Sequence, residues 1–229
     1  MLSDSQLDGL QRNLGVRFAD ITLLKRAFTH RSTGQQLPDG SPFSNQRLEF
    51  LGDSVLGLVI SEMLYHHFPH EAEGDLSKRE VALVNGVTLA EIARELKLGD
   101  SLILAQSEED HGGRDNPSNL EDACEALIGA IYLDQGLEVA RMFIEKHWSK
   151  RALQMNAPPK DPKTALQEWA QAKGLPLPEY VLVAETGPAH APQFTIKVRV
   201  EGQISQEAIA ASKKTAERDA AEKLLKNLL

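Results

Sequence analysis

The sequence predicts an all-α domain followed by a small α+β domain with the element order αβββα. Apolar residues recur at helical spacing through most of the first 150 residues. Apolar and polar residues then alternate strictly over 194–200, as in a half-buried strand. Three prolines within nine residues separate the two patterns, which is typical of a linker. We expect domains over 1–154 and 163–229, joined by a linker over 155–162.

The helices expected in the first domain follow from apolar periodicity and from glycine and proline positions. We expect two short helices between about 5 and 35, a loop over 34–44, helices over 45–68, 74–99, 119–133 and 137–153, and an exposed, polar loop over 107–118.

In the second domain the periodicity changes from helical to alternating and back. We expect a helix over 164–173, strands over 180–185, 194–200 and 204–210, and an alanine-rich helix over 212–228.

The composition is that of an ordinary globular protein, with 41% apolar and 25% charged residues in 229. No apolar run approaches the roughly 18 residues of a membrane span, and residues 1–10 do not resemble a signal peptide. The single cysteine, Cys124, permits no internal disulfide and fits a reducing compartment. We therefore expect a cytoplasmic protein with no membrane partner.

The net charge of −8, taken alone, argues against a nucleic-acid partner. The charge is unevenly distributed: residues 1–159 carry 15 Lys and Arg against 24 Asp and Glu, whereas residues 160–229 carry 10 against 9. The acidity therefore belongs to the first domain, and a basic patch in the second must come from the arrangement of its side chains.

Two nearly apolar helices each contain a pair of carboxylates on one face. Glu49 and Asp53 are four residues apart, and Asp122 and Glu125 are three apart. Burying like charges costs several kcal/mol each unless a cation or donor compensates. Oxygen ligands of this kind suit Mg²⁺, and two such ions roughly 3.5–4 Å apart can drive an in-line phosphodiester displacement. The alternative is that the acids lie on helix surfaces and pair with Arg47, Lys78 or Arg79.

The histidines offer two further interpretations. His66, His67 and His70 near a helix end form either a zinc site or, as we expect without a nearby cysteine, a solvated cluster. We expect His30 to orient a helix junction. A di-iron carboxylate bundle needs Glu-x-x-His pairs on facing helices. The only such pair in the sequence, Glu108 to His111, lies in the polar loop and does not support this kind of site.

Residues 45–56, NQRLEFLGDSVL, and 120–132, LEDACEALIGAIY, resemble the two acidic motifs of bacterial ribonuclease III. The αβββα order of the tail is similar to that of a double-stranded-RNA-binding domain. The likeness covers nearly the whole chain in the right order. It implies an all-α endonuclease domain followed by a small α+β (αβββα) double-stranded-RNA-binding domain.

This resemblance implies a homodimeric endoribonuclease that uses Mg²⁺, with Mn²⁺ as the alternative ion. It would cut double-stranded RNA to 5′-phosphate and 3′-hydroxyl ends and process structured rRNA and mRNA precursors. By position, Glu49, Asp122 and Glu125 would be metal ligands, and Asp53 and Glu125 the catalytic acids. Phe50 would belong to the dimer contact.

One residue inside the first motif departs from the family pattern, because many members have Glu where this chain has Gln46. An accessory acid is therefore missing. The four principal acids favour an active enzyme over a non-catalytic double-stranded-RNA-binding scaffold. A third and weaker hypothesis is a metal-dependent hydrolase of small nucleotides with an unrelated tail.

Ser212 is a natural helix N-cap, and Lys213 and Lys214 then fall in the first helical turn. Positive charge there is disfavoured by roughly 0.3–1 kcal/mol per residue, so an external anion such as an RNA phosphate would stabilise these lysines. The alternative is two solvated lysines.

The resemblance assigns further RNA contacts to the first helix and to the loop between the first two strands. These residues are Thr164, Gln167, Glu168, Pro188 and His190. Two departures from the pattern, alanines at 208, 210 and 211 in place of glycines and Glu217 in place of a third lysine, indicate modest affinity for RNA.

Overall fold

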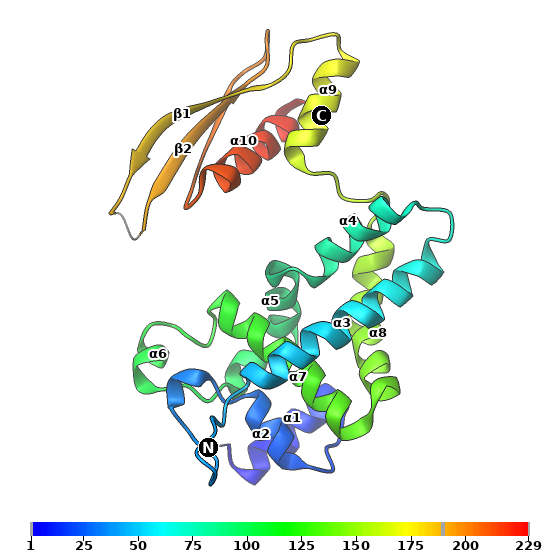
Figure 1. Cartoon of the computed structure of the whole chain (residues 1–229), viewed down its shortest axis with the longest axis vertical. Coiled ribbons are helices and arrows are strands. Elements are labelled where there is room, and N and C mark those ends of the chain that lie inside the picture. Colours follow the sequence, from blue (N-terminus) through cyan, green and yellow to red (C-terminus); the bar gives the residue numbers. More distant parts are fainter. Residues whose placement is uncertain (1, 189–190, 229) are drawn as a thin grey trace. The chain divides into compact units, whose positions relative to one another are not determined.

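The computed structural model describes residues 2–188 and 191–228. The chain forms two compact units, Met1–Pro158 and Pro159–Leu229, each with its own core (Figure 1). Within the described ranges, no helix is both long enough and apolar enough to span a bilayer.

The first unit is all-α, as predicted. Its α-helices are α1 (Asp4–Leu14), α2 (Ile21–Ala27), α3 (Gln46–His67), α4 (Glu73–Val84), α5 (Gly86–Glu95), α6 (Gln106–Asp110), α7 (Pro117–Gln135) and α8 (Leu137–Gln154), and two short 3₁₀ helices, η1 (Arg31–Thr33) and η2 (Leu98–Ser101), connect them.

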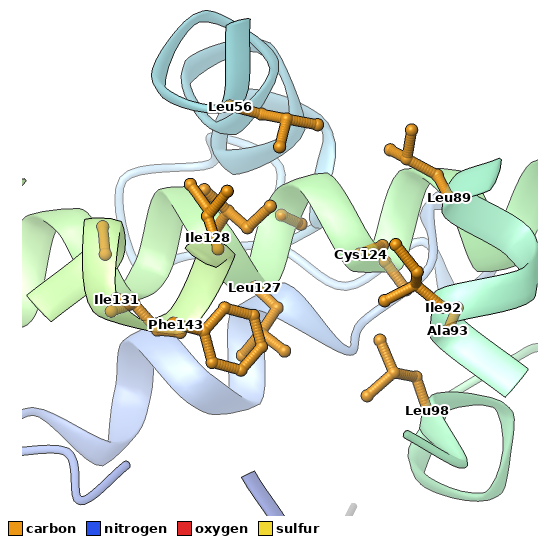
Figure 2. Packing of buried hydrophobic residues seen from close by; sticks show 14 of the residues in the cluster. Leu56, Leu89, Ile92, Ala93, Leu98, Cys124, Leu127, Ile128, Ile131 and Phe143 are labelled. Atoms are coloured by element: carbon orange, nitrogen blue, oxygen red, sulfur yellow. The ribbon is translucent and has the colours of Figure 1, made fainter. Parts of the chain in front are cut away.

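Helix α7 lies at the centre of this unit. It begins at a proline, and the side chain of Asn116 caps it by accepting a hydrogen bond from the Ser118 N–H. Its residues from Ala123 to Ile131 are all buried, as expected for a helix that is apolar nearly all round. Figure 2 shows Cys124 of α7 beside Leu89 and Ile92 of α5. The cysteine is therefore a core residue.

Helices α3 and α7 cross in contact (Figure 1), and two glycines make this contact unusually close. A Cβ atom added to Gly52 of α3 would lie 1.8 Å from the carbonyl oxygen of Glu125. A Cβ added to Gly129 of α7 would lie 2.2 Å from the carbonyl oxygen of Leu48. The two backbones therefore touch directly, with no side chain between them.

The prediction of an exposed loop over 107–118 was wrong in part, because this segment contains most of α6 and is ordered by Arg114. The Arg114 guanidinium forms an ion pair with Glu109 and donates hydrogen bonds to the carbonyl oxygens of Gly99 (3.0 Å) and Leu102 (2.9 Å). These bonds fix a polar, glycine-rich segment against the rest of the unit.

The second unit has the predicted αβββα order. It consists of α9 (Pro162–Ala172), an antiparallel sheet of β1 (Glu179–Thr186), β2 (Gln193–Arg199) and β3 (Gln206–Ala210) in that spatial order, and α10 (Lys213–Leu228). The alternation predicted for β2 holds, since Ile196, Val198 and the following Val200 are buried. Val198 and Val200 pack in one core with Leu166 of α9 and Leu224 of α10.

Candidate active site

The structure brings the four predicted acids to the crossing of α3 and α7. Glu49 and Asp53 belong to α3, and Asp122 and Glu125 to α7. The backbone contact of Gly52 with Glu125 places these two pairs on adjoining helical turns. Glu125 is only 9% exposed, whereas Asp53 is exposed.

The carboxylates influence one another's ionisation. Burial, and after it the negative charges of the neighbouring acids, of which Asp53 has the largest effect, raise the pKa of Glu125 to about 8. Burial also raises the pKa of Glu49 and of Asp122, and the charge of Asp122 adds to the rise at Glu49. The four acids thus form one electrostatic cluster.

No carboxylate of the four has a hydrogen bond or ion pair within the described part of the chain. The alternative in which these acids pair with surface cations is therefore wrong for two of its three proposed partners. Arg79 binds Glu71 and Lys78 binds Asp75. A nine-tenths-buried carboxylate without a protein partner, as at Glu125, requires a cation or a proton.

A short segment beside the cluster supplies a positive charge that the sequence reasoning missed. Arg31 of η1 is exposed, and its charge opposes the rise in the pKa of both Glu49 and Asp122. His30 is buried and caps η1, because its Nδ1 accepts a hydrogen bond from the Ser32 N–H (3.2 Å). The expectation that His30 orients a helix junction is therefore confirmed.

The donor chemistry of the cluster fits a hard divalent cation, since every candidate ligand is a carboxylate oxygen. Over the described residues, however, no three His, Cys, Asp or Glu side chains are close enough to hold a metal ion as they stand. This includes His66, His67 and His70, whose side chains are exposed.

Phe50 follows Glu49 on α3 and points to solvent, with 79% of its surface exposed. Other large apolar side chains of α3 are also exposed, namely Leu58 (55%) and Tyr65 (68%). An apolar patch on one helix of this kind favours contact with another protein surface.

In the second unit, the starts of α9 and α10 border a polar hollow. Its lining contains three of the predicted RNA-binding residues among the following set: Asp161, Lys163, Thr164, Gln167, Lys214, Thr215 and Arg218. The structure therefore brings the two helix starts together, and it adds Arg218, which the sequence reasoning missed.

The other predicted contacts of the first helix and of the α10 start lie outside that lining. Glu168 forms an ion pair with Lys160 (2.5 Å), and Lys213 lies 3.8 Å from a Glu185 carboxylate oxygen. The Ser212 Oγ accepts a hydrogen bond from the Thr215 N–H (3.1 Å), as predicted for an N-cap.

Two predicted residues belong to the loop after β1. Pro188 is exposed, and His190 lies outside the described residues.

Glu217 stands where the family pattern has a third lysine, and the structure shows what it contacts. Its carboxylate forms an ion pair with Lys163 (2.5 Å), whose Nζ also lies 4.7 Å from the centre of the Tyr180 ring. One cation at the hollow is therefore neutralised by an acid of the same unit, while the ion pair that Arg218 forms is with its neighbour Asp219, at 3.3 Å.

Comparisons with known proteins agree with this arrangement. Residues 20–152 match the family model described as Ribonuclease-III-like, and residues 162–228 match the Double-stranded RNA binding motif. The chain is 48% identical over 221 residues to Ribonuclease 3 of Wolbachia pipientis subsp. Culex pipiens (strain wPip), covering 96% of each protein. It is also 48% identical over 208 residues to Ribonuclease 3 of Ehrlichia ruminantium (strain Welgevonden), covering 91% of each.

Among solved structures, the nuclease domain of ribonuclease III from Campylobacter jejuni is 45% identical, with a TM-score of 0.56. The match covers 62% of this chain and 99% of that domain, which is described for structural flexibility in a region involved in dimer formation. Members of the family generally depend on a divalent metal ion. The chain belongs to the ribonuclease III family of endoribonucleases and carries a double-stranded-RNA-binding motif after its nuclease domain.

Proposed function

We propose that the chain is a Mg²⁺-dependent endoribonuclease that cuts both strands of an RNA duplex as a homodimer, with Mn²⁺ as the alternative ion. It processes structured precursors of rRNA and mRNA. The observation that carries this proposal is Glu125, which is nine-tenths buried beside three further acids and has no partner among the residues that the structure describes.

Each acid has a role that follows from its position. Glu49, Asp122 and Glu125, which are partly or fully buried, hold the cation through their carboxylate oxygens. When bound, the divalent cation lowers the pKa of a water molecule and stabilises the leaving oxygen. Asp53 is exposed, and its carboxylate, together with that of Glu125, orients the attacking water against the phosphate. Water adds to phosphorus and the bond to the 3′ oxygen breaks, which leaves a 5′-phosphate and a 3′-hydroxyl.

The homodimer is supported by the exposed apolar patch of α3. Phe50 lies next to Glu49, so a contact through this ring fixes the acids of one subunit relative to its partner. With one site per subunit, each site cuts one strand.

The second unit recognises the RNA duplex mainly through the shape of the duplex. Thr164, Gln167 and Glu168 are exposed along one side of α9 and contact the minor groove, as do Pro188 and His190 of the β1–β2 loop. The start of α10, with its lysines and Arg218, contacts the phosphates of the adjoining major groove.

Within this phosphate contact, Ser212 caps the helix while Lys213 and Lys214 supply charge. Because Glu217 neutralises Lys163, we expect modest affinity per unit, to which dimerisation adds avidity.

We propose the cytoplasm as the site of action. The single cysteine, Cys124, is buried and free, which suits a reducing compartment.

Glu125→Gln tests the proposal, with Glu145→Gln on α8 as the matched control. The wild-type chain and the control should cleave a perfect RNA duplex in the presence of Mg²⁺. Glu125→Gln should bind the duplex with unchanged affinity and cleave it at least about 10²-fold more slowly, because a charged group that acts in the transition state is lost.

Two outcomes would contradict this proposal. Unimpaired cleavage by Glu125→Gln would refute the assignment of the site. A wild-type chain that binds the duplex and leaves it intact would instead be the non-catalytic double-stranded-RNA-binding scaffold.

A further inference from the structure

A fifth acid, Glu121, lies beside the four predicted ones on α7. It precedes Asp122 in the chain and is four residues before Glu125, so Glu121 and Glu125 share a face of the helix. Its side chain is half-buried. The family pattern does not single it out, because its motif acids are accounted for by Asp122 and Glu125.

The position of the Glu121 carboxylate is set by Gly86, the first residue of α5. A Cβ added to Gly86 would lie 2.4 Å from Oε2, 2.8 Å from Oε1 and 2.7 Å from Cδ of Glu121. The carboxylate therefore occupies the space that the missing side chain of Gly86 leaves open. Any larger residue at this position would displace it.

Packing, rather than polar contact, holds Glu121 there. Across the described residues its carboxylate has no hydrogen bond and no ion pair. The start of α5 is already capped by Asn85, whose Oδ1 accepts a hydrogen bond from the Thr88 N–H (3.1 Å). A half-buried acid thus remains without a protein partner, as Glu125 does.

The charge of Glu121 acts on the catalytic cluster. It raises the pKa of Glu49 on α3 and of Glu125 on α7, while burial and the charge of Asp122 raise the pKa of Glu121 itself. Because Glu121 shares a face of α7 with Glu125 and precedes Asp122 directly, its carboxylate lies at the edge of the same group of acids.

We infer that Glu121, positioned by Gly86, is a fifth carboxylate of the cation site and strengthens the binding of divalent cations there. The inference rests on the proposed function, which supplies the cation. Gln46, one turn before Glu49 on α3, carries no charge, so α3 contributes two acids and α7 contributes three. The negative charge of five ionised carboxylates is larger than one divalent cation can neutralise, and it is close to the positive charge of two such ions.

The test is the affinity of the full chain for Mn²⁺ in the absence of RNA, measured from free Mn²⁺ by electron paramagnetic resonance. Glu121→Gln should raise the Kd for Mn²⁺ by about 10-fold or more, as loss of a supporting acid does at metal sites. Glu145→Gln, a control on α8, should leave it unchanged. Near-ultraviolet circular dichroism confirms that each variant is folded.

Gly86→Ala is a second test, because it keeps the charge of Glu121 and moves the Glu121 carboxylate. It should weaken Mn²⁺ binding in the wild-type background and have no further effect in the Glu121→Gln background, because both changes act through the same group. An unchanged Kd for Glu121→Gln would overturn the inference and leave Glu121 as a packing residue.

Comparing the Glu121→Gln and Glu125→Gln variants distinguishes failure of this inference from failure of the proposed function. If Glu125→Gln abolishes Mn²⁺ binding while Glu121→Gln does not alter it, only the inference fails. If Glu125→Gln binds Mn²⁺ as the wild-type chain does, the metal site itself is refuted and the inference falls with it.

Discussion

Gly52 of α3 lies so close to Glu125 of α7 that a Cβ atom at Gly52 would come within 1.8 Å of the Glu125 carbonyl oxygen. The same two helices carry the four acids that we propose as the active site. The distance between α3 and α7 is therefore fixed by contact between their backbones, and rotation of side chains cannot change it.

Gly52→Ala should force α3 and α7 apart. We expect the free energy of unfolding to fall by about 1–3 kcal/mol from overpacking. We also expect RNA cleavage to fall by about 10²-fold, because a shift of about 1 Å misplaces the acids. Urea denaturation and single-turnover cleavage measure the two effects.

Gly57→Ala is the matched control on the same helix. The nearest heavy atom to a Cβ at Gly57 is Oε1 of Glu80, at 4.0 Å, so the methyl group has room. This variant should be as stable as the wild-type chain or more stable by up to about 1 kcal/mol. Equal effects of the two substitutions would refute the close-contact argument.

The pKa of Glu125 predicts how stability depends on pH. Its ordinary value of 4.5 rises to about 8 in the folded chain, mainly through burial. Between these values the folded chain holds a proton that the unfolded chain has lost, so this group's contribution to stability falls as the pH rises. Without metal, the wild-type chain should lose at least about 1 kcal/mol more than Glu125→Gln between pH 5 and pH 8. Urea denaturation in a chelator measures this, and parallel curves for the two chains would contradict it.

Arg79 is a buried cation of the first unit, with 1% of its surface exposed. It donates two hydrogen bonds to Glu71 (2.6 and 2.7 Å) and one to the carbonyl oxygen of Met155 (2.7 Å), and it stacks on the Phe68 ring. Arg79→Ala should lower the free energy of unfolding by about 3–5 kcal/mol, because these partners lose their donor.

Arg94 provides the contrast, since its ion pair with Asp115 (2.6 Å) is largely exposed. Arg94→Ala should cost less than about 1 kcal/mol. Denaturant titration of both variants measures the two losses in the free energy of unfolding. If Arg79→Ala loses no more than Arg94→Ala, the buried contacts of Arg79 contribute little to stability.

Phe50→Ala should weaken the dimer. Removing an exposed ring at the centre of an interface typically costs about 2 kcal/mol, or about 30-fold in the dissociation constant. Analytical ultracentrifugation measures this change. Met142→Ala on α8, where the side chain is 63% exposed, is the control and should leave the dimer unchanged. If Phe50→Ala behaves like the control, the dimer uses another face.

Lys214→Gln and Arg218→Gln should each reduce the salt dependence of duplex-RNA binding. A lost phosphate contact lowers the slope of log K against log salt concentration by about 1. Lys226→Gln is the control, because Lys226 lies in the last turn of α10 and pairs with Glu222 (2.7 Å). An unchanged slope for Arg218→Gln would remove that residue from the RNA contact.

The elements that carry the acids could be predicted because their own residues determine them. The nearly continuous apolar sequence of α7 specifies a buried helix, and the strict alternation in β2 specifies a half-buried strand in the same local way. The helical turn in 106–110 could not be predicted in this way. Its order comes from Arg114, whose hydrogen-bond partners at Gly99 and Leu102 are supplied by a segment that precedes it.

The candidate site shows the same division. Spacing along one helix relates Glu49 to Asp53, and the spacing on α7 relates Asp122 to Glu125. The involvement of Glu121 depends on the absence of a side chain at Gly86, on another helix, and the neutralisation of Lys163 by Glu217 joins α9 to α10. Contacts between elements of this kind leave no periodic pattern in the sequence.

The acids at the crossing of α3 and α7 have no protein partners within the described residues, so the cation that we propose there would be a component of the folded state. Well above the dissociation constant, each tenfold rise in free cation adds about 1.4 kcal/mol to the stability of a one-site protein. The unfolded fraction that proteases remove falls in the same proportion. If the proposed ion is Mg²⁺, the cellular concentration of free Mg²⁺ would govern how long each molecule survives as well as how fast it cuts RNA.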